Sequence, residues 1–203
     1  MERKTERIRM YTRFERFWHW AQAVLVILLL ATGLETHGLY GILGYEKATE
    51  WHNALGIGWM VLYVFILFWL ATTGEWKQYV PTTKRLMAMA RYYAFGIFRG
   101  EESPVAKSRE AKLNPLQRLT YVAISLVLIP FQIATGLMYY TYSTWSARGW
   151  DLSLGEVAGL HTAGAYAFLA FLVVHVYMTT TGHRVLSHIK AMITGWEDVP
   201  VRK

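Results

Sequence analysis

Residues 157–182, VAGLHTAGAYAFLAFLVVHVYMTTTG, decide the fold that we expect for this chain. The stretch contains no Asp, Glu, Lys or Arg and is long enough to cross a bilayer as one helix. It carries two histidines, His161 and His175, and an ionisable residue inside a membrane span is a functional-site hypothesis by default. The two are fourteen residues apart. That spacing is nearly four helical turns and a rise of about 21 Å, so both rings leave the same helix face, one near each membrane surface.

Three other apolar stretches, at about residues 17–35, 51–74 and 119–142, also have the length of a membrane span. Together with residues 157–182 they predict an all-α membrane protein, a four-transmembrane-helix bundle that forms a single domain over residues 1–203. Pro130, inside the third span, predicts a kink there.

The segment between the second and third spans contains residues 82–98, TTKRLMAMARYYAFGIF, which mix basic with apolar residues. This composition suits an interfacial cytoplasmic helix that lies on anionic headgroups. An ordinary surface helix packed on the bundle explains it equally well.

Composition restricts the possible function. Hydrophobic residues make up 54% of the chain, which argues against a soluble globular protein. The chain has no cysteine, and this excludes disulfides, cysteine-ligated iron–sulfur clusters and c-type haem attachment. If the protein carries a redox cofactor, histidine must hold it.

The basic residues predict how the chain lies in the membrane. Nineteen of the 21 Lys and Arg residues fall in residues 1–16, in residues 75–118 or in the C-terminal tail. The two short loops have only Lys47 and Arg148. The positive-inside rule therefore places both termini and the long loop in the cytoplasm. We find no clustered basic face with base-reading residues, so we expect no nucleic-acid partner.

This topology gives each histidine a depth in the membrane. His52 begins the second span at the outer side, level with His161, and His19 begins the first span at the cytoplasmic side, level with His175. Two bis-histidine pairs are predicted, each suited to the iron of one haem, because such ligation leaves no open position and favours electron transfer. A metal bound without haem is less favoured, because the pairs lack a carboxylate or a third ligand. We expect the other three histidines, His37, His183 and His188, to be anchors or loop residues.

Small residues recur beside the predicted haem sites. Thr32-Gly33-Leu34 in the first span is repeated as Thr135-Gly136-Leu137 in the third, which suggests a weak internal duplication of a helical hairpin. Gly33 and Gly136 could give clearance to the outer porphyrin, although small residues in membrane helices also serve simply to pack helices together.

The chain resembles the di-haem cytochrome b subunits of respiratory formate dehydrogenases, nickel–iron hydrogenases and thiosulfate-type reductases, which have a cytochrome b561-like bundle. The resemblance rests on Phe17-Trp18-His19-Trp20 after a basic lead, on His52, and on the two histidines of the fourth span. It implies two b haems, the outer one bound by His52 and His161 and the inner one by His19 and His175.

The resemblance also implies a quinone site near the inner haem. Asn114 and Gln117 lie in the segment that helps to form this pocket in the family, and an amide there can hydrogen-bond a quinone carbonyl. Asn114 followed by Pro115 is also typical of a helix start, with Asn as the cap. Both interpretations can hold together.

We therefore expect a quinone-reactive electron-transfer subunit of an oxidoreductase complex, multi-pass in the inner membrane of a bacterium or archaeon and surrounded by its lipids. Its quinone would be menaquinone or ubiquinone. A periplasm-facing iron–sulfur or multihaem cytochrome subunit and a catalytic subunit would be its partners, because this chain has no molybdopterin, nickel or iron–sulfur ligand set. Two alternatives are a stand-alone cytochrome b561-type oxidoreductase that oxidises superoxide or a small donor, and a proton-relay transporter or structural anchor.

Overall fold

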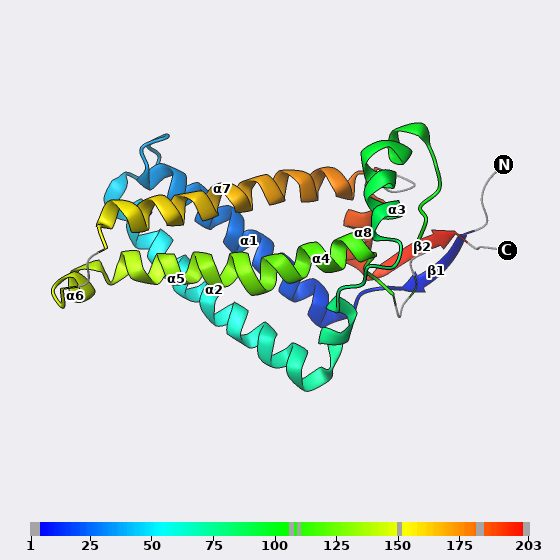
Figure 1. Ribbon diagram of the computed structural model, residues 1–203, viewed down its shortest axis with the longest axis horizontal. Helices are drawn as coiled ribbons and strands as arrows, with labels where there is room; N and C mark the ends of the chain where they lie inside the picture. The colour runs from blue at the N-terminus through cyan, green and yellow to red at the C-terminus, as the bar shows by residue number, and fades with distance from the viewer. Residues whose placement is uncertain (1–4, 106–107, 109–110, 150–151, 182–184, 201–203) are drawn as a thin grey trace. The chain divides into compact units, whose positions relative to one another are not determined.

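The computed structural model describes residues 5–105, 108, 111–149, 152–181 and 185–200. The protein is 74% helical, and four of its helices are long and apolar enough to span a membrane. They are α1 (Arg13–Thr36), α2 (Tyr45–Thr73), the run from Pro115 to Tyr140, and α7 (Leu154–Thr179) (Figure 1). The predicted all-α membrane fold with four spanning helices is confirmed.

The third spanning helix is interrupted at its middle. It consists of α4 (Pro115–Ala123), the π-helical turn η4 (Ile124–Leu128) and α5 (Ile129–Tyr140). Pro130 explains the position of the interruption, because its ring lacks an N–H and clashes with the carbonyl one turn before it. Tyr63 donates its hydroxyl proton to the carbonyl of Ser125 inside the π turn, at 2.6 Å. The irregularity expected at Pro130 therefore takes the form of a π turn in which a neighbouring helix satisfies a backbone acceptor.

The chain folds into two compact units, each assembled from segments that are far apart in the sequence. The second unit contains residues 18–69 and 125–172, and the regular elements among its described residues are all helices. In it, Leu29 on α1 lies against Gly56 on α2, and the rings of Trp59 on α2 and Phe168 on α7 meet edge to face, 5.5 Å apart. Helix α6 (Tyr142–Ser146) lies in the loop before α7.

The outer faces of the long helices are apolar. Val61 and Phe68 on α2, Leu126 on η4 and Tyr166 on α7 each expose 60% or more of their surface. Exposure of so much apolar surface is unfavourable in water but natural against lipid chains. These faces therefore agree with the assignment of the four helices to a membrane.

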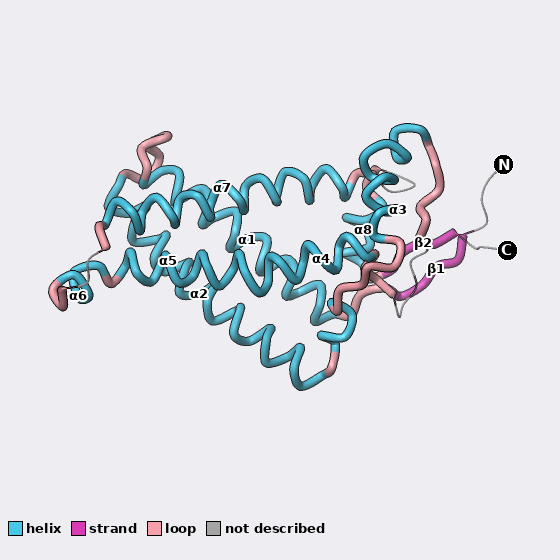
Figure 2. Tube along the Cα trace, viewed as in Figure 1, coloured by secondary structure: helices cyan, strands magenta, loops and turns pink. Residues whose placement is uncertain are grey.

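The first unit contains residues 1–17, 70–124 and 173–203, and it includes a small sheet that the sequence did not predict. Strand β1 (Thr5–Arg9) pairs antiparallel with β2 (Trp196–Pro200), so that Arg9 lies opposite Trp196 (Figure 2). An isolated pair of strands is marginally stable, and further contacts are needed to hold it. The backbone N–H groups of Met10 and Tyr11 both donate to the carbonyl of Gly195, at 2.8 and 3.2 Å.

Gly195 also ends helix α8 (Ser187–Thr194). Its φ of +87° is left-handed, and a Cβ there would lie 2.8 Å from the carbonyl oxygen of Tyr11. Only glycine meets both conditions without strain. The two ends of the described chain are thus joined at one point.

Short helical segments connect α2 to α4. They are η1 (Glu75–Tyr79), α3 (Leu86–Arg91), the π turn η2 (Tyr92–Gly96) and η3 (Ile97–Arg99). A helix is therefore present between the second and third spans, but it begins only at Leu86. Its position at the membrane surface stays a prediction.

Candidate functional site

His52 and His161 lie together in the second unit. Their ring centroids are 6.1 Å apart and the ring planes cross at 88°. His52 lies in the first half of α2, and His161 in the first half of α7. A histidine nitrogen binds zinc at about 2 Å and iron at a similar distance, so two rings that share one metal ion have centroids roughly 6 Å apart. The observed spacing is therefore suited to a metal held between the two rings.

Thr32 determines which nitrogen of His52 is available to a metal. The Thr32 hydroxyl oxygen lies 3.0 Å from His52 Nδ1, and the hydroxyl donates to the carbonyl of Leu28 at 2.8 Å. A hydroxyl has one proton, so while that proton is donated to Leu28 the oxygen can only accept, here from His52 Nδ1–H, and the backbone carbonyl of Leu29 also accepts from the His52 ring. The lone pair of the neutral ring is then on Nε2, which is the state that a metal ligand needs.

Thr135 holds His161 in the same way. Its hydroxyl oxygen is 3.1 Å from His161 Nδ1 and donates to the carbonyl of Phe131 at 2.9 Å. The lone pair of His161 is therefore also on Nε2. The side-chain nitrogen of Gln132 lies 3.3 Å from His161 Nε2, a distance at which it can donate a hydrogen bond to the lone pair. Within the described structure the Gln132 Oε1 atom is buried and has no hydrogen-bond partner.

Gly33 and Gly136 make room for the two imidazole rings. A Cβ on Gly33 would lie 3.2 Å from His52 Cε1, and a Cβ on Gly136 would lie 3.0 Å from His161 Cε1. Both distances are tighter than ordinary side-chain contacts. Each Thr-Gly pair thus has two tasks, because the threonine orients the ring and the glycine admits it. Clearance for a porphyrin by the same glycines stays a prediction.

The second predicted pair is divided between the two units. His19 lies on α1 in the second unit, where its ring meets that of Trp20 edge to face at 5.3 Å. His175 lies on α7 in the first unit. The structure therefore shows both residues on spanning helices, and their pairing stays a prediction.

The other histidines have separate environments. His37 Nε2 lies 3.1 Å from the hydroxyl of Thr162, and His188 Nδ1 lies 3.0 Å from a carboxylate oxygen of Glu197. His183 falls outside the described residues. The contacts that the structure gives for His37 and His188 are with a hydroxyl and a carboxylate, not with a second imidazole.

Asn114 and Gln117 come together at the start of α4. The Asn114 side-chain oxygen accepts from the Gln117 backbone N–H at 2.9 Å, and the Gln117 side-chain oxygen accepts from the Asn114 N–H at 3.0 Å. This reciprocal capping box, followed by Pro115, confirms the helix-start interpretation. A quinone-binding role for the two amides stays a prediction.

Asn114 also contacts Tyr93, a residue that the sequence did not indicate for this site. Its side-chain nitrogen donates to the hydroxyl of Tyr93 at 2.9 Å, and Asn114 is only 7% exposed. Burial raises the pKa of Tyr93, which keeps the phenol protonated. Since its oxygen accepts from Asn114, the hydroxyl proton of Tyr93 can be donated to another group.

No three of the described His, Asp or Glu side chains gather as a metal-binding cluster. The His52–His161 pair supplies two nitrogen ligands, and six-coordinate iron needs four more. A haem macrocycle supplies four, so the donor set fits haem.

Comparison with known proteins agrees with this fit. The sequence model of a family described as "Prokaryotic cytochrome b561" matches residues 10–195. The Escherichia coli (strain K12) protein YdhU, which is named as a cytochrome, is 30% identical over 94% of this chain and 75% of its own length.

Two relatives are named as B-type cytochrome subunits of Ni/Fe-hydrogenase. The one from Cupriavidus necator is 28% identical over 80% of this chain and 74% of its own length. The one from Azotobacter vinelandii is 25% identical over 96% of this chain and 90% of its own length. No solved structure matches the chain.

Proposed function

Because the chain belongs to the prokaryotic cytochrome b561 family, we propose that it is a di-haem cytochrome b subunit that passes electrons between a periplasmic redox partner and the quinone pool. The protein is a multi-pass membrane cytochrome b that takes part in electron transfer, and its family implies haem b. Our proposal adds the number of haems, their ligands, the quinone and the partner subunits.

The observation that carries the proposal is the His52–His161 pair. The ring centroids are 6.1 Å apart with the planes nearly perpendicular, and a threonine hydroxyl lies at hydrogen-bond distance from Nδ1 of each ring. These two residues hold the outer haem iron through Nε2. When bound, the haem supplies one-electron redox chemistry, while the chain provides ligands, orientation and a water-poor surrounding.

His19 and His175 hold the inner haem in this proposal. Helix α7 supports it because it is continuous from Leu154 to Thr179 and carries both His161 and His175. Fourteen residues along one helix put these rings on one face, about 21 Å apart. Two haems held at the two depths would belong to one domain that covers residues 1–203.

The quinone, menaquinone or ubiquinone, binds close to the start of α4. Asn114, Gln117 and Tyr93 support this assignment because they place two amides and a phenol together at the end of a spanning helix. Tyr93 is a donor to a quinone oxygen, because its own oxygen accepts from the Asn114 side-chain nitrogen and its hydroxyl proton can be given to another group.

The charge distribution supports the orientation and the setting. Nineteen of the 21 basic side chains lie outside the two short loops, so both termini face the cytoplasm of a prokaryotic cell with the chain in its inner membrane. The hydrogenase-subunit names of two relatives support a multi-subunit complex. An iron–sulfur or multihaem cytochrome subunit on the periplasmic side and a catalytic subunit would complete it.

The direct test is purification from native membranes with spectroscopy and quinol oxidation. We expect reduced b-type haem bands, and we expect a quinol analogue added without oxygen to reduce the haem. A co-purifying redox subunit favours the complex, whereas full activity of the isolated chain with a small donor favours a stand-alone oxidoreductase. A colourless protein would contradict the proposal.

A further inference from the structure

A polar pocket lies in the first unit, where three distant segments of the chain meet. Its volume is about 260 Å³, and its lining includes Arg9 and Tyr11 before α1, Glu75 and Gln78 on η1, and Lys112 before α4. The pocket brings together carboxylate, ammonium, guanidinium, phenol and amide groups. Charges of both signs line it, so it is not built for an anion.

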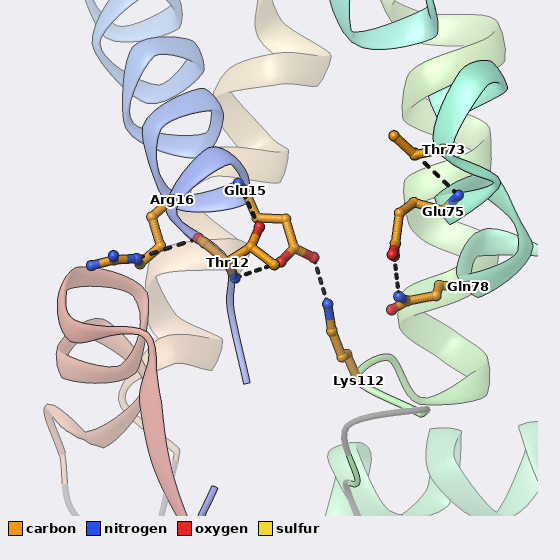
Figure 3. Close-up of polar contacts among 7 residues, drawn as sticks. All are labelled: Thr12, Glu15, Arg16, Thr73, Glu75, Gln78 and Lys112. Carbon is orange, nitrogen blue, oxygen red and sulfur yellow. Dashed lines mark hydrogen bonds and ion pairs between the residues drawn. The ribbon is translucent and has the colours of Figure 1, made fainter. Parts of the chain in front are cut away.

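An ion pair between buried Lys112 and half-buried Glu15 adjoins the pocket. Lys112 Nζ lies 2.6 Å from Glu15 Oε1, and the two side chains are 8% and 20% exposed (Figure 3). The other carboxylate oxygen of Glu15 accepts from the backbone N–H of Thr12 at 2.7 Å. Removing two charges from water has a desolvation cost that is about as large as the attraction between them. The pair therefore contributes little net stability, which leaves room for a functional role.

A second carboxylate faces the same pocket from another element. Glu75 accepts a hydrogen bond from the side-chain amide of Gln78, one helical turn later, and is partly exposed (Figure 3). Glu75 therefore lines the pocket from η1, whereas Glu15 on α1 adjoins it through Lys112.

Two phenols accompany the pocket, because Tyr11 lines it and Tyr79 follows the lining residue Gln78. Burial raises the pKa of Tyr11, and it raises the pKa of Tyr79 to about 12. The charge of Glu197 raises the pKa of Tyr11 further, and the charge of Glu15 raises the pKa of both phenols. Phenols with raised pKa values remain protonated and can accept and donate hydrogen bonds in a relay.

The hydrogen-bonded pair of Asn114 and Tyr93 is the end of the relay nearest the proposed quinone site. Lys112 is two residues before Asn114, which donates to the hydroxyl of Tyr93. Tyr121 lies within electrostatic range of Tyr79 and of Tyr93. Lys112, which lines the pocket, is therefore close along the chain to the amide that donates to Tyr93, the phenol that we place beside the quinone.

We propose that this pocket, with Glu75, Glu15 and Lys112, is the route by which protons pass between the cytoplasm and the quinone. The inference rests on the proposed function. Reduction of one quinone takes two electrons from the haem side and two protons, and both new O–H bonds form at the quinone oxygens. The pocket delivers the protons from cytoplasmic water, and when quinol is oxidised it releases them by the same route.

Glu75→Gln in the purified haem-loaded protein is the first test. Glutamine keeps the size of the side chain and can still accept from Gln78, but it cannot carry a proton. Stopped-flow haem reduction by a quinol analogue, in H₂O and in D₂O, measures the coupled step. We expect a rate lower by a factor on the order of ten and a larger solvent isotope effect. Haem content and direct reduction by dithionite should stay unchanged.

Glu6→Gln is the matched control, because Glu6 is an exposed carboxylate on β1 in the same unit. It should behave as the wild type. The second test variant combines Glu15→Gln with Lys112→Met, so that neither charge is left buried without its partner. It should also slow the quinol reaction while keeping its haem.

Wild-type rates and isotope effects in both test variants would overturn the proton route. Failure of the wild-type protein itself to react with quinol would instead contradict the proposed function. A change in dithionite reduction equal to the change in the quinol reaction would also overturn the route, because it would show a general effect on the haem.

Discussion

The hydroxyl oxygen of Thr32 lies 3.0 Å from Nδ1 of His52 and has already donated its own proton to Leu28. It is therefore an acceptor for the ring N–H. Thr135 stands in the same relation to His161, at 3.1 Å. When a metal-bound imidazole donates its other ring N–H to an acceptor, the basicity of the ligating nitrogen rises. The two threonines thus act on the proposed haem iron without touching it.

Replacement of Thr32 by valine keeps the shape and removes the acceptor. His52 then becomes a weaker electron donor to the iron, so the midpoint potential of one haem should rise, and metal-site affinity losses of about 10- to 100-fold are typical of such changes. Redox titration of the purified protein measures the potential. Thr32→Ser should restore the wild-type value.

Thr36→Val is the control for this change, because Thr36 lies one turn further along α1 and bonds only to the Gly33 carbonyl in the described structure. Identical potentials in the Thr32→Val and Thr36→Val proteins would show that Thr32 does not act on the haem.

Gly136→Ala tests the contact between the third span and His161. The new Cβ would lie 3.0 Å from His161 Cε1, so the ring must move from its present position. Overpacking of this kind costs about 1–3 kcal/mol, and we expect a lower haem content and a lower thermal midpoint. Gly159→Ala on α7 is the matched control, since nothing lies within 4 Å of its Cβ position. Equal haem content in the two variants would contradict a packing role for Gly136.

Asn114 has a structural and a proposed functional role, and two substitutions separate them. Asn114→Ala removes the cap, which costs about 1 kcal/mol, together with the hydrogen bond to Tyr93. Asn114→Asp keeps an acceptor for the Gln117 N–H but cannot donate to Tyr93 when ionised. Quinol oxidation should fall in both variants with haem retained, and thermal stability should fall mainly in Asn114→Ala. Normal quinol kinetics in Asn114→Asp would limit Asn114 to the cap.

The sequence located the spanning helices well, because bilayer thickness sets the length of an apolar run. The helices extend beyond the predicted spans, since α2 and α7 start at Tyr45 and Leu154, in polar segments that hydropathy does not detect. Depth in the membrane alone predicts the pairing of His52 with His161, and the structure brings these two rings together.

Other features depend on contacts that sequence periodicity does not encode. Strands β1 and β2 lie at opposite ends of the described sequence, and neither has an alternating apolar pattern. The contact of Tyr93 with Asn114 spans 21 residues. The repeated Thr-Gly-Leu motif did mark Thr32 and Thr135, but only the structure shows that their hydroxyls meet the histidine rings.

The central claim is that His52 and His161 share one haem iron, and haem quantitation tests it most directly. The pyridine haemochrome assay should find two b haems per chain in the purified wild type and one in both His52→Ala and His161→Ala. His37→Ala, outside the pair, should keep both. Wild-type haem content in either the His52 or the His161 variant would contradict the account.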